Sequence, residues 1–165
     1  MDEAELTIAI IPRERTEWTS QSPSRIRFEY AAVKGAVPRP LDRIASGGEI
    51  SRVMLAVKTV LGEHDQVDTL VFDEIDTGTG GAVARAVGKL LSELSQTHQI
   101  IAITHHAQLA SSADAHFVVS RTGARTSLKK VEGEEREREI ARMLSGSITA
   151  SSLSHAKELL DQAHR

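Results

Sequence analysis

The chain contains 165 residues, of which 40% are hydrophobic and 26% charged, and its formal net charge is −3. This length is enough for one substantial core, and the slight acidity excludes the strongly basic surface typical of a nucleic-acid-binding domain. The absence of cysteine excludes disulfides and thiolate chemistry. No apolar stretch approaches the roughly 20 residues that span a bilayer, and the acidic N-terminus lacks a signal-peptide pattern. We therefore expect a cytoplasmic protein without a membrane partner.

Strands and helices are predicted to alternate along the chain. In chain order we expect strands over residues 6–11 and 25–30, a helix over 46–62, a strand over 69–72, a helix over 83–94, a strand over 99–103, a short helix over 107–111, a hairpin of strands 116–120 and 126–131, and helices over 134–145 and 151–164. The continuous apolar runs 69–72 and 99–103 are typical of strands buried on both faces of a parallel sheet. The order predicts an α/β fold with a mostly parallel central sheet flanked by helices.

Two adjacent carboxylates, Asp73 and Glu74, follow the predicted strand 69–72. Neighbouring residues at a strand end point in different directions, so Asp73 can face a metal ion while Glu74 faces a water molecule. In phosphoryl transfer, Mg²⁺ binds phosphate oxygens together with a carboxylate, and a second carboxylate can orient or deprotonate the attacking water. The carboxyl edge of an open α/β sheet is also where ligands bind. A simple solvated strand end would explain the same two residues.

Four residues at the predicted start of the helix 46–62 form a second candidate site: Ser46, Gly47, Gly48 and Glu49. The glycines expose backbone N–H groups, the helix dipole favours an anion there, and Ser46 adds a hydroxyl donor. These groups would suit a phosphate. A plain capping box, in which Ser46 and Glu49 cap the helix, is the alternative.

A histidine pair, His105 and His106, follows the predicted strand 99–103. At a neighbouring strand end, His105 could hydrogen-bond a γ-phosphate or the attacking water, although His106 complicates the assignment. The pair, with Asp73 and Glu74, also raises the alternative of a metal-dependent hydrolase. Adjacent histidines are expected to diverge, and no His-Glu-x-x-His spacing occurs, so transition-metal ligation is disfavoured.

One absence and one charge pattern narrow the function further. Gly-x4-Gly-Lys-Ser/Thr does not occur, so the usual loop around the β- and γ-phosphates is missing from this sequence. Basic and acidic residues alternate over residues 129–142, which predicts a solvated face with local ion pairs and not a DNA-binding patch.

The order of these motifs resembles the C-terminal lobe of an ABC-type, P-loop ATPase head. Ser46–Glu49 is similar to the signature motif, Val71–Glu74 to the Walker B strand, Asp76–Gly78 to the D-loop and His105 to the switch histidine. The resemblance implies one domain over residues 1–165. It would comprise a strand-rich N-terminal segment (1–40), a core with the motifs (41–131) and C-terminal helices (132–165).

Within this class, the amino-acid sequences of four segments resemble the bacterial RecN family. RecN proteins are relatives of the SMC proteins and take part in double-strand-break repair. These segments are Ile44–Arg52, Phe72–Gly78, Ala141–Leu144 and His155–Leu160. The resemblance implies that Asp73 helps to hold Mg²⁺, that Glu74 is the catalytic base and that His105 contacts the γ-phosphate of ATP. Where this chain has His106, we expect an apolar residue in the family.

The resemblance also implies partners. The signature residues, Ser46, Gly47, Gly48 and Glu49, would contact ATP bound to a second head, and Asp76 would act across that interface. The family's Walker A lobe and coiled coil are further expected partners, DNA would be bound through the full-length protein near the nucleoid, and this chain alone would be inactive. The alternatives are the head of a transporter or of another SMC relative, and a non-catalytic module that docks a partner on the Ser46 helix.

Overall fold

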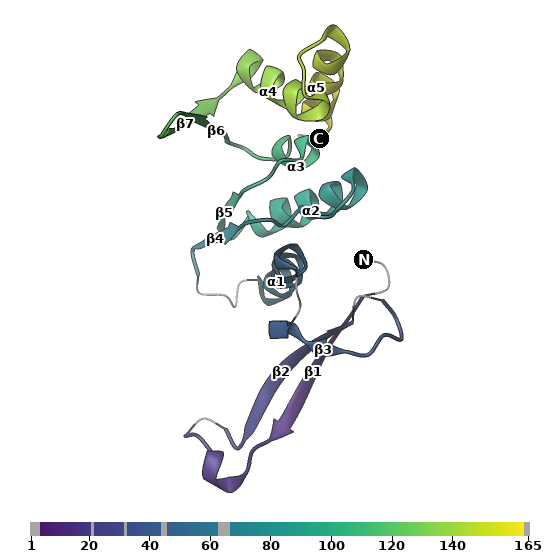
Figure 1. Ribbon diagram of the computed structural model, residues 1–165, viewed down its shortest axis with the longest axis vertical. Helices are drawn as coiled ribbons and strands as arrows, with labels where there is room; N and C mark the ends of the chain where they lie inside the picture. The colour runs from purple at the N-terminus through teal and green to yellow at the C-terminus, as the bar shows by residue number, and fades with distance from the viewer. Residues whose placement is uncertain (1–3, 21, 32, 44–45, 63–66, 164–165) are drawn as a thin grey trace. The chain divides into compact units, whose positions relative to one another are not determined.

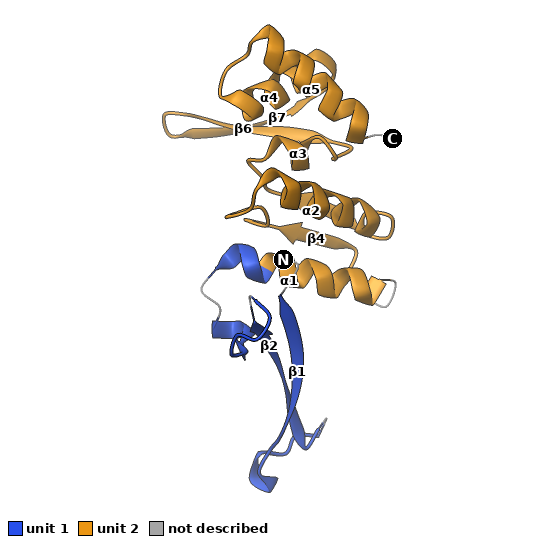
Figure 2. Ribbon diagram, turned by 90° about the vertical axis from the view of Figure 1, so that its right-hand side faces the viewer, with its two compact units in different colours: residues 1–50 blue, residues 51–165 orange. Residues whose placement is uncertain are grey.

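The computed structural model describes residues 4–20, 22–31, 33–43, 46–62 and 67–163. They fall into two compact units, residues 1–50 and 51–165, with the boundary inside helix α1 (Gly47–Leu61) (Figure 2). The prediction of one domain over residues 1–165 stays a prediction. Ile44 and Ala45, which begin the segment resembling the RecN family, and His164, the predicted end of the last helix, lie outside the described residues.

The first unit is built on a long antiparallel hairpin (Figure 1). Strand β1 (Glu5–Pro12) pairs with β2 (Ser24–Ala31), and β2 pairs with the short β3 (Arg39–Pro40). Two 3-10 turns, η1 (Arg15–Glu17) and η2 (Leu41–Arg43), complete the unit. Several apolar side chains of the hairpin are exposed, namely Leu6, Ile8, Ile10, Ile26 and Phe28. Within the described residues, the hairpin therefore has little core of its own.

The second unit contains a parallel strand pair, β4 (Thr69–Phe72) and β5 (Gln99–Ala102), in register from Thr69 opposite Gln99 to Phe72 opposite Ala102. Helix α2 (Gly81–Leu94) connects the two strands. The Ile103 N–H donates a hydrogen bond of 2.9 Å to the Phe72 carbonyl, so both strands end at the same edge. The first core lies between α1, β4, α2 and the short helix α3 (Ala107–Ala110). Its buried residues are Leu55, Leu70, Phe72, Ile75, Val87, Leu91, Leu94 and Leu109.

A second core lies in the C-terminal part of the same unit. It joins α3 (Ala107–Ala110), α4 (Gly133–Ser145) and α5 (Ala150–Ala163), while β6 (His116–Thr122) and β7 (Arg125–Val131) form an antiparallel hairpin before α4. Its buried residues are Ala107, Ala110, Ile140, Ala141, Ala156 and Leu159. The four-residue helix α3 thus contributes to both cores, Leu109 to the first and its two alanines to the second.

The predicted order of strands and helices is confirmed, but the sheet differs from the expectation. Among the described strands, only β4 and β5 pair in parallel, while the other pairs are antiparallel. The prediction that these two strands are buried on both faces is wrong for the described residues, because Val71 is 62% exposed and Ile101 is 46% exposed. Leu70 and Phe72 face the first core, and the opposite face of this two-stranded sheet is open. Within the described part of the chain, no helix is long and apolar enough to cross a bilayer.

Candidate functional site

The turn after β4 carries the predicted acidic pair. Asp73 and Glu74 are both exposed, and the Asp73 carbonyl accepts a hydrogen bond of 2.9 Å from the Ser51 hydroxyl. Glu74 has a φ of 57°, in the left-handed region, and its carbonyl accepts a 3.0 Å hydrogen bond from the Thr77 N–H. A non-glycine residue in this region costs about 1–3 kcal/mol, and such strain is concentrated at functional sites.

Arg52 fixes this turn from helix α1. Its Nη1 donates hydrogen bonds of 3.1 Å to the carbonyls of Ile75 and Thr77, and Ile75 is fully buried in the first core. These bonds, with that of Ser51, hold the acidic pair against the helix turn that follows the predicted signature motif. Neither Ser51 nor Arg52 was assigned a role from the sequence, although both lie in the segment Ile44–Arg52 that resembles the RecN family.

Asp76 links the two strand ends. Its side chain is only 1% exposed, and its Oδ2 accepts hydrogen bonds from the Thr104 hydroxyl and, at 3.2 Å, from the His105 backbone N–H. The His105 Nδ1 lies 3.7 Å from the same oxygen. Burial acts to raise the pKa of Asp76, but the bond from Thr104, further hydrogen bonds and nearby His105 outweigh it and lower the pKa. The carboxylate is therefore held ionised inside its own unit.

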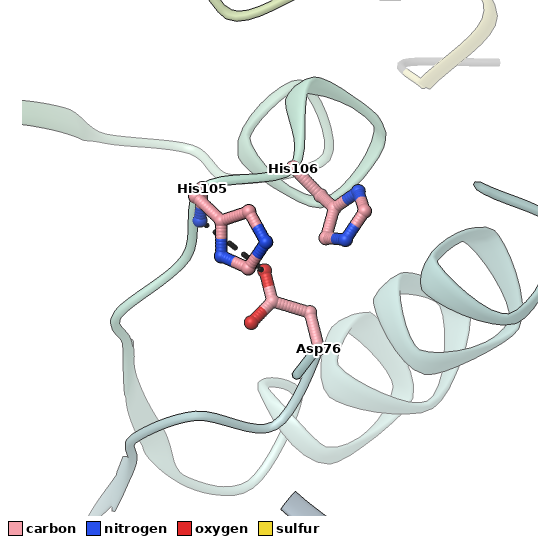
Figure 3. A group of neighbouring side chains, drawn as sticks. All are labelled: Asp76, His105 and His106. Carbon is pink, nitrogen blue, oxygen red and sulfur yellow. Dashed lines mark hydrogen bonds and ion pairs between the residues drawn. The ribbon is translucent and has the colours of Figure 1, made fainter. Parts of the chain in front are cut away.

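The two histidines lie directly before α3, beside Asp76 (Figure 3). The His105 side chain is 72% exposed, and His106 is half-buried. Their ring centroids are 4.5 Å apart, so the expectation that these adjacent side chains diverge is wrong. Next to them is a cavity of about 210 Å³, lined by Gly81, His105, His106, Ala107, Gln108, Met143 and Leu144.

The structure brings some of the predicted site residues together. Asp76 and His105 are in contact, and Thr104, a residue not predicted from the sequence, donates a hydrogen bond to the same Asp76 oxygen. Asp73 and Glu74 follow β4 at the edge where β5 also ends, but no contact of their carboxylates with His105 is observed among the described residues. Their convergence on one phosphate therefore stays a prediction.

The predicted signature residues belong to the other unit. The Ser46 carbonyl accepts a 3.2 Å hydrogen bond from the Ile50 N–H, as expected for the residue before α1, and Gly48 is buried. In the described part of the chain, no side-chain hydrogen bond of Ser46 or Glu49 is observed, so the predicted capping box does not form there. The phosphate-binding role of Ser46, Gly47, Gly48 and Glu49, like the role of Asp76 across a head interface, stays a prediction.

Solved structures with a similar arrangement are SMC heads. The Smc head domain with a coiled coil and joint derived from Pyrococcus yayanosii matches with a TM-score of 0.58 and 20% identity, over 98% of this chain and 26% of that chain. The Smc head domain derived from Pyrococcus furiosus, with an extended coiled coil and bound to the C-terminal domain of ScpA, gives a TM-score of 0.56 and 20% identity, over 98% and 33%. The fold is therefore that of an α/β, ABC-type ATPase head lobe of the SMC class.

Comparison with curated protein sequences identifies the family within this class. The DNA repair protein RecN of Treponema pallidum is 51% identical over 140 residues, which are 82% of this chain and 24% of that protein. RecN of Deinococcus radiodurans is 46% identical over 141 residues, 83% of this chain and 25% of that protein. No protein-family model matches the chain. The chain belongs to the RecN family, and it spans about a quarter of the length of these relatives.

Proposed function

We propose that this chain is the C-terminal lobe of the ATP-hydrolysing head of a RecN-like protein in DNA double-strand-break repair. The observation that supports this most directly is the shared edge at which β4 and β5 end. It places Asp73 and Glu74 after one strand and Thr104 and His105 after its parallel neighbour. Ligands bind at this edge in open α/β sheets.

Each side chain at this edge has the exposure that its proposed role requires. Asp73 is exposed, which fits a Mg²⁺ ion that keeps several waters and reaches the protein through one or two carboxylates. Glu74, also exposed, would act as the base for the attacking water, and Arg52 would fix the turn that aims it. His105, exposed and anchored through its backbone to Asp76, would contact the γ-phosphate.

The proposed site is composite. Ser46 and Gly48 would contact the nucleotide of a second head, where the N-terminus of α1 offers backbone N–H groups to a phosphate. The phosphate-wrapping loop would come from a Walker A lobe, because the sequence printed here contains no Gly-x4-Gly-Lys-Ser/Thr. We propose that this lobe covers the open face of β4 and β5, where Val71, Ile101 and Ile103 are exposed.

An ATPase assay on two samples tests this function. The chain alone should not turn over ATP, and addition of a separately produced Walker A lobe of the same family, with Mg²⁺, should produce turnover. Glu74→Gln should lower that turnover by about 10²- to 10⁴-fold, the usual contribution of a catalytic base. Glu93→Gln, at an exposed position on α2, is the matched control and should leave turnover unchanged.

Two results would contradict the proposal. Turnover by the pure chain that Glu74→Gln abolishes would show that no second lobe is required. Full tolerance of Glu74→Gln in the reassembled sample, combined with loss of partner binding in Ser46→Arg, would instead identify a docking module.

A further inference from the structure

Three side chains that can ligate a metal ion gather beside the cavity next to α3: Asp76, His105 and His106 (Figure 3). Their ligand atoms all lie within 4.8 Å of one another. His106 has no part in the proposed ATPase chemistry, yet its ring lies with its centroid 4.5 Å from that of His105 and lines the cavity. Among the described residues, no hydrogen bond to either ring nitrogen of His106 is observed.

We propose that Asp76, His105 and His106 form a site for a divalent transition-metal ion, with Zn²⁺ as the representative ion. Two imidazoles and one carboxylate are ligands of zinc and its neighbours, whereas Mg²⁺ takes oxygen ligands almost exclusively. The site is therefore chemically different from the magnesium position proposed at Asp73. Three protein ligands would leave a fourth coordination position for a water molecule or another small ligand.

The buried carboxylate is already oriented for this role. Asp76 Oδ2 accepts hydrogen bonds from the Thr104 hydroxyl and the His105 N–H, which fix the plane of the carboxylate. The His105 Nδ1 lies 3.7 Å from this same Oδ2, so Oδ2 is the carboxylate oxygen that would contact the ion. Hydrogen bonds of this kind, to a ligand that itself contacts the ion, orient the ligands in natural metal sites.

Only small movements separate this arrangement from a coordination sphere. Ligand atoms at about 2.1 Å from a tetrahedral ion lie about 3.4 Å apart, compared with separations of up to 4.8 Å here. The His105 side chain is 72% exposed and His106 lines a cavity, which leaves both rings room to move.

Titration of the chain with Zn²⁺, and with Co²⁺ as a spectroscopic probe, tests the site in the absence of nucleotide. Calorimetry should show one equivalent bound to the wild type, and Co²⁺ should give the visible absorption of a four- or five-coordinate ion. His106→Leu and His105→Ala should each weaken binding by at least roughly tenfold. His155→Ala, which removes an exposed histidine on α5, should bind as the wild type does, and excess Mg²⁺ should not displace the ion.

NMR spectra of the histidine ring nitrogens in the wild type provide a measurement that depends on no variant. Zn²⁺ should shift the resonances of His105 and His106 and leave those of His98 and His155 in place. No binding, binding that survives both His105→Ala and His106→Leu, or shifts confined to other histidines would each overturn the proposal.

A bound ion would also engage His105, and this consequence rests on the proposed function. Zn²⁺ should then inhibit ATP turnover by the reassembled head, and His106→Leu should relieve the inhibition. Loss of ATPase activity for any other reason would leave the nucleotide-free titrations unaffected, so the two proposals fail separately.

Discussion

The two cores of the second unit differ in how completely they are closed. In the C-terminal core, Ile140, Ala141 and Ala156 have no exposed surface, and α3, α4 and α5 cover one another. In the first core, α2 covers one face of β4 and β5, while Val71 and Ile101 remain exposed on the other. The C-terminal core is thus closed by its own helices. The core that carries the candidate site instead leaves one apolar face of β4 and β5 exposed, which suits packing against a further structural layer.

Single truncations should separate these two regions most strongly. Ile140→Ala should lower the free energy of unfolding by about 2–5 kcal/mol, because it empties a fully buried position. Val71→Ala should change it by less than about 0.5 kcal/mol in this chain, because the side chain is exposed, but should weaken association with the Walker A lobe. Denaturant titration and a binding assay measure both effects. A large stability loss from Val71→Ala would show that the open face is covered within this chain.

Arg52→Ala should have the next largest effect, concentrated in the first core. The variant loses two hydrogen bonds from a charged donor to the carbonyls of Ile75 and Thr77, at a cost of about 1.5–3 kcal/mol. Hydrogen exchange should speed up in the turn after β4 and remain slow in α4 and α5. Arg138→Ala, at an exposed position of α4, is the matched control. Equal loosening of both cores would contradict a local role.

Lowering the pH should reduce the free energy of unfolding in two different ranges, one set by His116 near the C-terminal helices and one set by Asp76 in the turn after β4. Burial and the Arg136 guanidinium lower the pKa of His116, against the opposing effect of Glu139. The unfolded chain therefore binds the proton more readily, and stability should fall as pH drops through about 6.5, the unfolded value for histidine. His116→Gln should remove this dependence, which thermal melting at several pH values would measure.

The lowered pKa of Asp76 acts at lower pH. Its contribution to stability is present above the unfolded pKa of about 3.9 and is lost as pH falls through the folded pKa. Asp76→Asn should therefore flatten the stability profile only in this acidic range, and not between pH 5 and 7. A change of slope between pH 5 and 7 in Asp76→Asn would contradict this assignment.

The smallest predicted effect concerns the left-handed backbone of Glu74. Glu74→Gly should raise the free energy of unfolding by about 0.5–1 kcal/mol, because glycine adopts this conformation without steric cost. Glu74→Gln, which keeps a side chain, should leave stability unchanged. If Glu74→Gly is no more stable than Glu74→Gln in denaturant titrations, the turn is not strained.

The local sequence pattern was sufficient to predict the helices and strands, but not the contacts between residues that are far apart in the sequence. The helical spacing of apolar residues predicted α1 and α2, and the apolar runs predicted β4 and β5. The burial of Asp76 was not predictable, because its partner Thr104 is 28 residues away and a turn aspartate is usually solvated. The exposure of Val71 was missed for a similar reason, since an apolar run does not reveal how many layers cover a strand.

The sequence predicted which residues belong to the candidate site. It did not predict the contacts that hold these residues in place. Asp73, Glu74 and His105 were identified because each follows an apolar strand. Arg52 was not identified, because the acceptors of its hydrogen bonds are backbone carbonyls, which leave no mark in a sequence. The φ of Glu74 was equally invisible, since glutamate has no preference for that conformation.

The shared helix α3 couples the candidate site to the C-terminal helices. Leu109 anchors it in one core and Ala107 in the other, and Arg136 of α4 donates a 3.1 Å hydrogen bond to the Ser111 carbonyl at its end. His105 lies two residues before the first residue of this helix, so a shift of α3 together with α4 and α5 would act on it. A load applied to the C-terminal helices would therefore reach the histidine and, through the hydrogen bond from its N–H to Asp76, the turn after β4.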